Sequence, residues 1–233
     1  MLVNRRIYRH RLWVRITHWI NAICMTVLLM SGLQIFNAHP ALYWGDASRF
    51  DALLVEIGPF PSWATLPGSE WLAMGRRWHF FFAWVFVANG AVYGLPAILG
   101  GHFRRDLLPS RSDLRQIGHS MWRHMQLRFQ EGDGAKHYNV LQKLAYLVVL
   151  CVLCPFIVLA GLAMSLHLDA GYPWLLWIFG GRQSARTIHF VCAFSLLGFV
   201  VVHLLMLLVS GVWNNIRSMI TGWYDIGKRH VRP

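Results

Sequence analysis

The sequence has little charge, and the charge that it has is unbalanced. Only 14% of its 233 residues are charged and 56% are apolar, whereas a soluble domain carries about a quarter charged residues. Lysine and arginine number 22, against 10 aspartates and glutamates. This composition excludes an ordinary soluble domain and is typical of an integral membrane protein.

Cysteine is also scarce, and all four residues fall inside apolar runs: Cys24, Cys151, Cys154 and Cys192. The C-x-x-C spacing of Cys151 and Cys154 would suggest a redox motif in a soluble chain. A thiolate is strongly disfavoured in apolar surroundings, so we interpret these cysteines as small buried hydrophobic side chains. The sequence also lacks a phosphate-binding loop, an internal repeat and a signal-peptide cleavage site after its arginine-rich start.

Four apolar runs reach the length that crosses a bilayer, at about residues 16–36, 78–99, 140–166 and 188–209, the third interrupted by Pro155. Basic residues concentrate in the N-terminal tail, in residues 100–139 and in the C-terminal tail. Because positive charge stays in the cytoplasm, these segments are predicted to be cytoplasmic, and residues 37–75 and 167–185 to lie outside. The whole chain, 1–233, is therefore predicted to be one all-α, four-helix transmembrane bundle.

The net charge of +12 raises the question of nucleic acid as a partner. The basic residues lie between and beyond the apolar runs and do not form a stripe on a soluble face, as nucleic-acid binding requires. We therefore interpret the positive charge as the feature that sets the orientation of the helices in the membrane. The predicted partner is the lipid bilayer, and no nucleic acid is expected.

Histidine placement carries the functional signal. His189 and His203 lie fourteen residues apart in the fourth run, which on a helix puts both on nearly the same side, about 21 Å apart along the axis. The predicted topology matches them in depth with histidines of other runs: His79 with His189 near the outer face, and His18 with His203 near the cytoplasmic face. Two imidazoles from two helices at one depth are what a six-coordinate haem iron needs.

Three other interpretations are weaker. A lone histidine at a span end is more often an interfacial residue or a partner in helix packing, but four that match in depth favour two b-type haems. Zinc needs at least three protein ligands, and each level offers two. A proton relay would need carboxylates in the apolar runs, and there are none.

Haem also requires cationic partners for its propionates and small residues beside its flat ring. The predicted propionate partners are Arg76, Arg77 and Arg186 outside and Arg15 inside, with Arg182, Lys143 and Arg217 as further candidates. The small residues are Gly32, Gly90, Gly94, Gly161 and Gly198, which also suit ordinary helix packing.

Four stretches then resemble a known family: RITHW at 15–19, MSGLQI at 30–35, RRWHFFFAW at 76–84, and the fourteen-residue histidine spacing of the last run. They are similar to the prokaryotic cytochrome b561 family, which includes the di-haem b-type subunits of Ni/Fe-hydrogenases, formate dehydrogenases and thiosulfate reductases. The resemblance implies haem ligands at His18, His79, His189 and His203. It also implies the bacterial inner membrane as location, a separate catalytic subunit and electron exchange with membrane quinone. Residues 37–75 resemble members that accompany periplasmic molybdopterin oxidoreductases.

We therefore predict a respiratory-chain cytochrome that transfers electrons between a periplasmic oxidoreductase and quinone. The quinone site is left among three polar candidates, Asn21, His119 and Arg123. Two alternatives remain: a stand-alone superoxide:quinone oxidoreductase whose outer arginines steer the anion, and a membrane anchor without cofactor. Residues 37–75, rich in Pro, Gly and Trp, are expected to form a loop without helix or strand, either resting on lipid headgroups or docking a partner.

Overall fold

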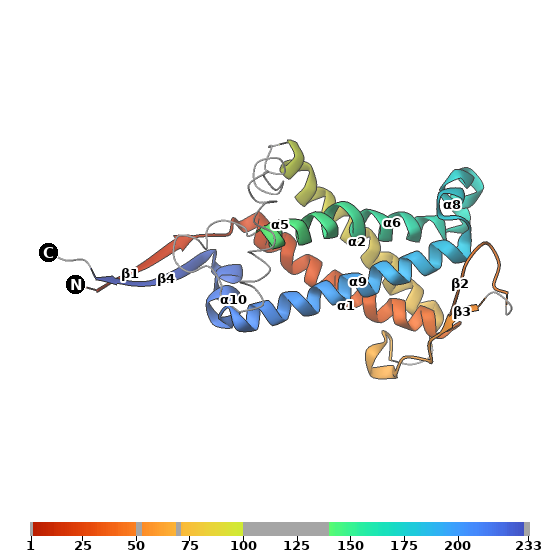
Figure 1. The fold of residues 1–233 in the computed structure, drawn as a ribbon, viewed down its shortest axis with the longest axis horizontal. Helices are drawn as coiled ribbons and strands as arrows, with labels where there is room; N and C mark the ends of the chain where they lie inside the picture. The colour runs from red at the N-terminus through yellow and green to blue at the C-terminus, as the bar shows by residue number, and fades with distance from the viewer. Residues whose placement is uncertain (1, 50–52, 69–70, 100–139, 231–233) are drawn as a thin grey trace. The chain divides into compact units, whose positions relative to one another are not determined.

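The described part of the protein is mainly helical and includes two two-stranded sheets. The computed structural model describes residues 2–49, 53–68, 71–99 and 140–230. Its long helices are α1 (Leu12–Asn37), α2 (Leu72–Leu99) and α9 (Arg182–Val209). A further long helical segment joins α5 (Val140–Leu147), a π-helical turn (Val148–Leu153) and α6 (Cys154–Ala163). Figure 1 labels these helices along the chain.

Four helices within the described residues are long and apolar enough to cross a membrane: Leu12–Asn37, Leu72–Pro96, Lys143–Ala163 and Arg182–Val209. The predicted helical membrane bundle is thereby confirmed. Three helices begin earlier than predicted, at residues 12, 72 and 182 in place of 16, 78 and 188. Hydrogen bonding within a helix continues past the last apolar turn, so hydropathy alone marks only the part that lipid surrounds.

The interruption predicted at Pro155 takes the form of a change in helix type. Residues Val148–Leu153 wind as a π-helix, and α6 begins at Cys154 with the proline in its first turn. Proline has no backbone N–H and crowds the preceding turn, so a local widening of the helix accommodates it without ending the span.

The expected loops and tails contain more structure than the sequence suggested. The region 37–75 forms β2 (Ala41–Tyr43), which pairs antiparallel with β3 (Leu53–Glu56), followed by the 3-10 turn η2 (Ser62–Ala64). Residues 167–185 contribute to α7 (Leu166–Gly171), α8 (Pro173–Phe179) and the first turn of α9. The expectation of a loop without helix or strand was wrong for residues 37–75.

The two tails are also ordered. β1 (Leu2–Tyr8) pairs antiparallel with β4 (Trp223–His230), and α10 (Val212–Thr221) precedes β4. The register runs from Leu2 opposite His230 to Tyr8 opposite Trp223. These strands are short and rich in arginine and lysine, so they lack the apolar alternation that identifies a strand from sequence.

Backbone contacts divide the chain into two compact units. The terminal unit comprises Met1–Trp19, Ala91–Val148 and Phe199–Pro233, and the central unit comprises Ile20–Gly90 and Val149–Gly198. His18 and His203 belong to the terminal unit, and His79 and His189 belong to the central unit. Each predicted histidine pair thus lies inside one unit.

The central unit has its apolar core where α6, α8 and α9 meet. Ala160, Ala163, Leu175, Phe179 and Ala185 are buried there together. The three alanines let the helix backbones approach closely, and the two larger side chains of α8 fill the space above them. This core holds the start of α9, the helix that carries His189, against α6.

The start of α9 is also tied to the segment between α1 and β3. The Gly45 carbonyl accepts hydrogen bonds from the backbone N–H groups of Gln183 (2.9 Å) and Ser184 (3.2 Å). The Ser184 hydroxyl in turn accepts from the Gly45 N–H at 2.7 Å. The first N–H groups of a helix have no partner inside it, so this reciprocal cap fixes where α9 begins.

Candidate functional site

The central pair, His79 and His189, brings together two helices of the central unit. The ring centroids of His79 on α2 and His189 on α9 are 6.1 Å apart, and the ring planes meet at 60°. Both histidines are half-buried among the neighbouring helices. The structure therefore places next to each other the two histidines that the sequence assigned to the outer level.

Each ring of the central pair is held through its Nδ1 atom. His189 Nδ1 lies 2.8 Å from the Ile157 carbonyl oxygen, so it donates its proton there. His79 Nδ1 lies 3.1 Å from Ser31 Oγ. The Ser31 hydroxyl donates to the Val27 carbonyl at 2.6 Å, so its oxygen accepts the His79 proton. A proton on Nδ1 leaves Nε2 as the nitrogen with a free lone pair.

The terminal pair, His18 and His203, has a closely similar spacing. The ring centroids of His18 on α1 and His203 on α9 are 6.3 Å apart, with 65° between the planes. Phe199 stacks on His203 at 6.2 Å and 20°, and Trp19 lies edge-on to His18 at 5.5 Å. Within the described part of the chain, neither ring has a hydrogen bond like those of the central pair. Aromatic contact replaces polar contact here.

The two spacings can be compared with the geometry of a shared metal ion. With a metal–imidazole bond of about 2.0 Å and about 1.2 Å from nitrogen to ring centre, two imidazoles on opposite sides of one metal have ring centres about 6.4 Å apart. The observed 6.1 and 6.3 Å fall close to this separation. Groups of three or more His, Cys, Asp or Glu side chains suited to a metal ion do not occur among the described residues. Two-histidine ligation, as in haem, fits these residues better than zinc.

The predicted propionate partners have different surroundings. Arg76 lies over the Phe80 ring at 5.6 Å and is exposed, as is Arg77. Arg186 hydrogen-bonds the His39 carbonyl and lies over the Phe36 ring at 5.3 Å, so it already joins α9 to the end of α1.

On the other level, Arg15 Nη1 donates to the Ile220 carbonyl of α10. Arg15 Nε is buried without a hydrogen-bond partner among the described residues. A buried cationic N–H that lacks an acceptor fits an anionic group close by, and Arg15 lies about one helical turn before His18.

The predicted small residues divide into two kinds. A Cβ at Gly32 would lie 3.4 Å from His79 Cε1, and one at Gly161 would lie 3.2 Å from His189 Cε1. At Gly90, Gly94 and Gly198, a Cβ would meet no described atom within 4 Å. Gly32 and Gly161 therefore make room for the imidazoles themselves, a role that the sequence analysis did not assign to them.

Of the three quinone candidates, His119 and Arg123 lie outside the described residues. The third, Asn21 on α1, accepts a 2.7 Å hydrogen bond from the buried Asn89 amide on α2. This bond joins two membrane helices of the central unit, which is a sufficient reason for an asparagine in an apolar span.

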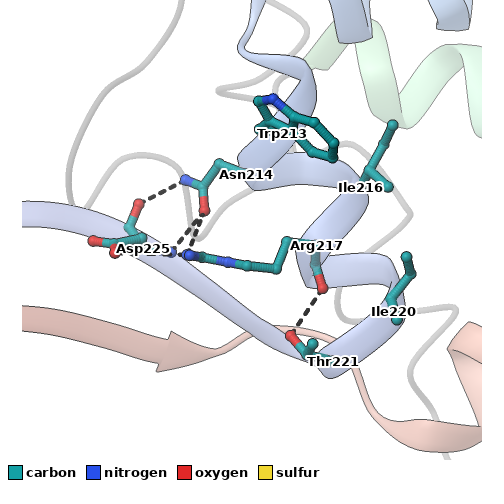
Figure 2. Close-up of a pocket in the computed structure, with 7 residues that line it drawn as sticks. All are labelled: Trp213, Asn214, Ile216, Arg217, Ile220, Thr221 and Asp225. Atoms are coloured by element: carbon teal, nitrogen blue, oxygen red, sulfur yellow. Dashed lines mark hydrogen bonds and ion pairs between the residues drawn. The ribbon is translucent and has the colours of Figure 1, made fainter.

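The terminal unit contains a shallow groove of about 520 Å³ between α10 and β4. Figure 2 shows Asn214, Arg217 and Asp225 linked along one edge and the apolar side chains Trp213, Ile216 and Ile220 beside them. The Asn214 amide donates to the Asp225 carbonyl at 2.7 Å, and Arg217 approaches the Asp225 carboxylate at 3.6 Å. This network fastens α10 to β4, and it uses the polar groups of the groove internally.

Comparison with known proteins agrees with this architecture. The profile of the family described as prokaryotic cytochrome b561 matches residues 9–222. A relative from Azospira oryzae, named putative protein-methionine-sulfoxide reductase subunit YedZ1, is 31% identical over 223 residues. That alignment covers 94% of this chain and all of the relative. The comparison with solved structures found no match.

Four membrane-length helices, three of which bring histidines together in pairs, are the architecture of a membrane cytochrome. The chain belongs to the prokaryotic cytochrome b561 family, as the resemblance in the sequence implied. It is accordingly a multi-pass membrane haem protein that takes part in electron transfer.

Proposed function

We propose that the chain holds two b-type haems and passes electrons between a partner subunit outside the membrane and quinone inside it. The observation that carries this proposal is the pair of imidazole spacings, 6.1 Å and 6.3 Å, each between histidines of two membrane helices. His79 and His189 would ligate one iron, and His18 and His203 the other. A bound haem supplies a one-electron carrier in a medium that excludes free charge.

The residues of the chain have separate roles in this proposal. The four histidines would bind the two haem irons and orient the haems. The helices exclude water from the space around the histidines. Arg76 and Arg77, which are exposed at the start of α2, are the better propionate partners on their level, because Arg186 is engaged with His39 and Phe36. Arg15 is the partner on the other level, on the strength of its unsatisfied Nε. A carboxylate gains charge-assisted hydrogen bonds from such guanidinium groups.

The arrangement in the membrane follows from charge. The basic tails and residues 100–139 lie in the cytoplasm of a bacterial inner membrane, so the central pair lies toward the outer face and the terminal pair toward the cytoplasm. The partner then meets the central unit, where β2, β3 and the exposed side chains of Trp44 and Trp63 lie. Quinone reacts on the cytoplasmic side of the bundle.

The relative supports a subunit over a stand-alone enzyme. Its name describes a subunit of a putative protein-methionine-sulfoxide reductase, and the alignment with this chain covers its full length. We propose that this chain also serves a catalytic subunit, of the molybdopterin class. The alternative, superoxide:quinone oxidoreductase, rests on a cationic patch of outer arginines that would steer the anion. Arg76 and Arg77 are exposed, so the name of the relative, and not the charge pattern, favours the subunit.

The test is a haem-to-protein ratio on the chain purified in mild detergent, with reduced-minus-oxidised spectra. Two b-type haems per chain, reducible by a quinol analogue, are expected. One haem per chain would refute one ligand pair, and none would refute the electron-transfer function. Co-purification with a tagged chain from its native membrane then distinguishes a stable catalytic partner from an enzyme that reduces quinone with superoxide alone.

A further inference from the structure

The central pair is supported by two matching arrangements on neighbouring helices. The His79 ring lies against Gly32 of α1, and the His189 ring lies against Gly161 of α6. In both cases the closest ring atom to the ideal Cβ position is Cε1, at 3.4 Å and 3.2 Å, and the second is Nδ1, at 3.6 Å and 3.4 Å. Each imidazole thus meets a glycine with the same edge.

A hydrogen-bond acceptor accompanies each glycine. The Ile157 carbonyl, which accepts from His189, belongs to the residue four positions before Gly161. The Ser31 hydroxyl, which accepts from His79, directly precedes Gly32. The backbone of Leu28, four positions before Gly32, also interacts with His79. A residue and its i+4 neighbour share a face of a helix, so the glycine removes the side chain that would block this acceptor.

The buried state of these groups makes the contacts specific. Ser31 is fully buried, and its hydroxyl is already oriented by the Val27 carbonyl. A buried Nδ1–H without an acceptor would be costly, so each ring is confined to the orientation in which its proton meets the helix. Because Nδ1 is used in this hydrogen bond, Nε2 is the nitrogen that stays available to a metal.

We propose that these two supports, Gly32 with Ser31 on α1 and Gly161 with the Ile157 carbonyl on α6, are positioning elements that set the reduction potential of the central haem site. The inference rests on the proposed function, in which His79 and His189 are the ligands. An acceptor on Nδ1–H makes the imidazole more basic toward the metal and fixes its tautomer. A more basic ligand stabilises the oxidised iron, so both supports lower the potential.

Ser31→Ala tests the first support. The reduction potential of one haem should rise by about 28 mV. For a one-electron couple at a fixed solution potential, this lowers the oxidised-to-reduced ratio of that haem about threefold. Ser195→Ala is the matched control, because its hydroxyl bonds only its own helix at Val191 and is exposed. The measurement is a spectroscopic redox titration of the purified chain. A potential equal to that of the control, with haem retained, would overturn the role of Ser31.

Glycine substitutions test the second support with an internal gradient. Gly161→Ala should displace the His189 ring by tenths of an ångström, because its Cβ would be 3.2 Å from Cε1. We expect about tenfold weaker haem retention and an altered low-spin electron paramagnetic resonance signal from one haem. Gly32→Ala, at 3.4 Å, should have a smaller effect, and Gly90→Ala, with no described atom within 4 Å, should have none. Equal behaviour of all three variants would refute the inference.

His79→Ala separates this inference from the proposed function. If His79→Ala leaves both haems in place, the ligand assignment is wrong. The proposed positioning role of the two supports then fails with it. If His79→Ala removes one haem while Ser31→Ala and Gly161→Ala leave the potentials and the resonance signal unchanged, the assignment stands and the positioning role is wrong.

Discussion

The two histidine pairs have nearly the same spacing but different supports. In the central pair both Nδ1 atoms are hydrogen-bonded, to Ser31 and to the Ile157 carbonyl. In the terminal pair the neighbouring rings are aromatic side chains, Phe199 beside His203 and Trp19 beside His18. His203 is also exposed on the protein surface, whereas His189 is not. One pair is oriented by polar groups that tolerate little displacement, and the other by contacts that weaken gradually with distance.

The largest effect is expected from removing a ligand. His189→Ala should remove the central haem and leave the terminal one, and His203→Ala should do the reverse, so each variant retains one haem per chain. The pyridine haemochrome assay against protein concentration measures this. His39→Ala is a suitable control, because this histidine is exposed and stacks on Tyr43 at 5.5 Å. Loss of both haems from either variant would mean that the two units do not bind independently.

A second prediction compares one glycine from each unit. Gly181 (φ 111°) and Gly222 (φ 90°) both have backbone angles that disfavour other residues. A Cβ at Gly181 would lie 2.5 Å from the Gly45 backbone, whereas at Gly222 it would lie 2.5 Å from the Tyr8 ring. Each alanine should cost at least about 1–3 kcal/mol, and Gly181→Ala should cost more, because a side chain can move and a backbone cannot.

Thermal unfolding followed at each haem band would measure the difference between these alanine variants. The central haem should be released earlier in Gly181→Ala and the terminal haem earlier in Gly222→Ala. Release of the same haem first in both variants would contradict the division into two separately supported sites.

Phe199→Leu should have a smaller effect, confined to the terminal pair. It removes the ring that stacks on His203, a contact of about 0.5–1.5 kcal/mol, and keeps an apolar side chain in place. Terminal haem retention should fall by less than about tenfold, with the central haem unchanged. Phe194→Leu is the control, because it removes a ring that stacks on another phenylalanine, Phe190, at 4.5 Å. A loss as large as that of His203→Ala would show that the ring does more than pack.

The smallest expected effect concerns pH and the terminal unit. Burial, followed by the charges of Arg9, His18 and Arg15, lowers the pKa of His10 from 6.5 to about 4. A histidine whose pKa is lower in the folded state contributes stability at pH above 6.5 that is lost as the pH falls toward 4. His10→Gln should flatten this part of the stability–pH curve, measured by thermal unfolding between pH 4 and 7. An unchanged slope would exclude His10 as its source.

The sequence was sufficient for the parts of the molecule that depend on periodicity and charge. Long apolar runs identified the four membrane helices, and the histidine positions predicted which rings meet. The ligand role of these rings and the orientation in the membrane stay predictions. The supports were not predictable, since Ser31 and Ile157 are ordinary residues of apolar helices until another helix brings a ring against them.

One prediction was close to the observed role, and one element was missed. Gly32 and Gly161 were noted as small residues beside a haem, and in the structure they lie against the imidazoles of His79 and His189. The β1–β4 pair was missed because its strands are short and basic, and their partner lies at the other end of the chain. Pairing over such a distance leaves no local pattern.

That pairing imposes an order in time. Leu2 lies opposite His230, and Tyr8 opposite Trp223, so β1 has no partner until residues 223–230 have been made. His18 likewise has no partner ring until His203 has been made. His79 and His189 belong to the central unit, whose last residue is Gly198. During synthesis the central site can therefore close first. The terminal site is the last to form and the first that a truncated chain would lack.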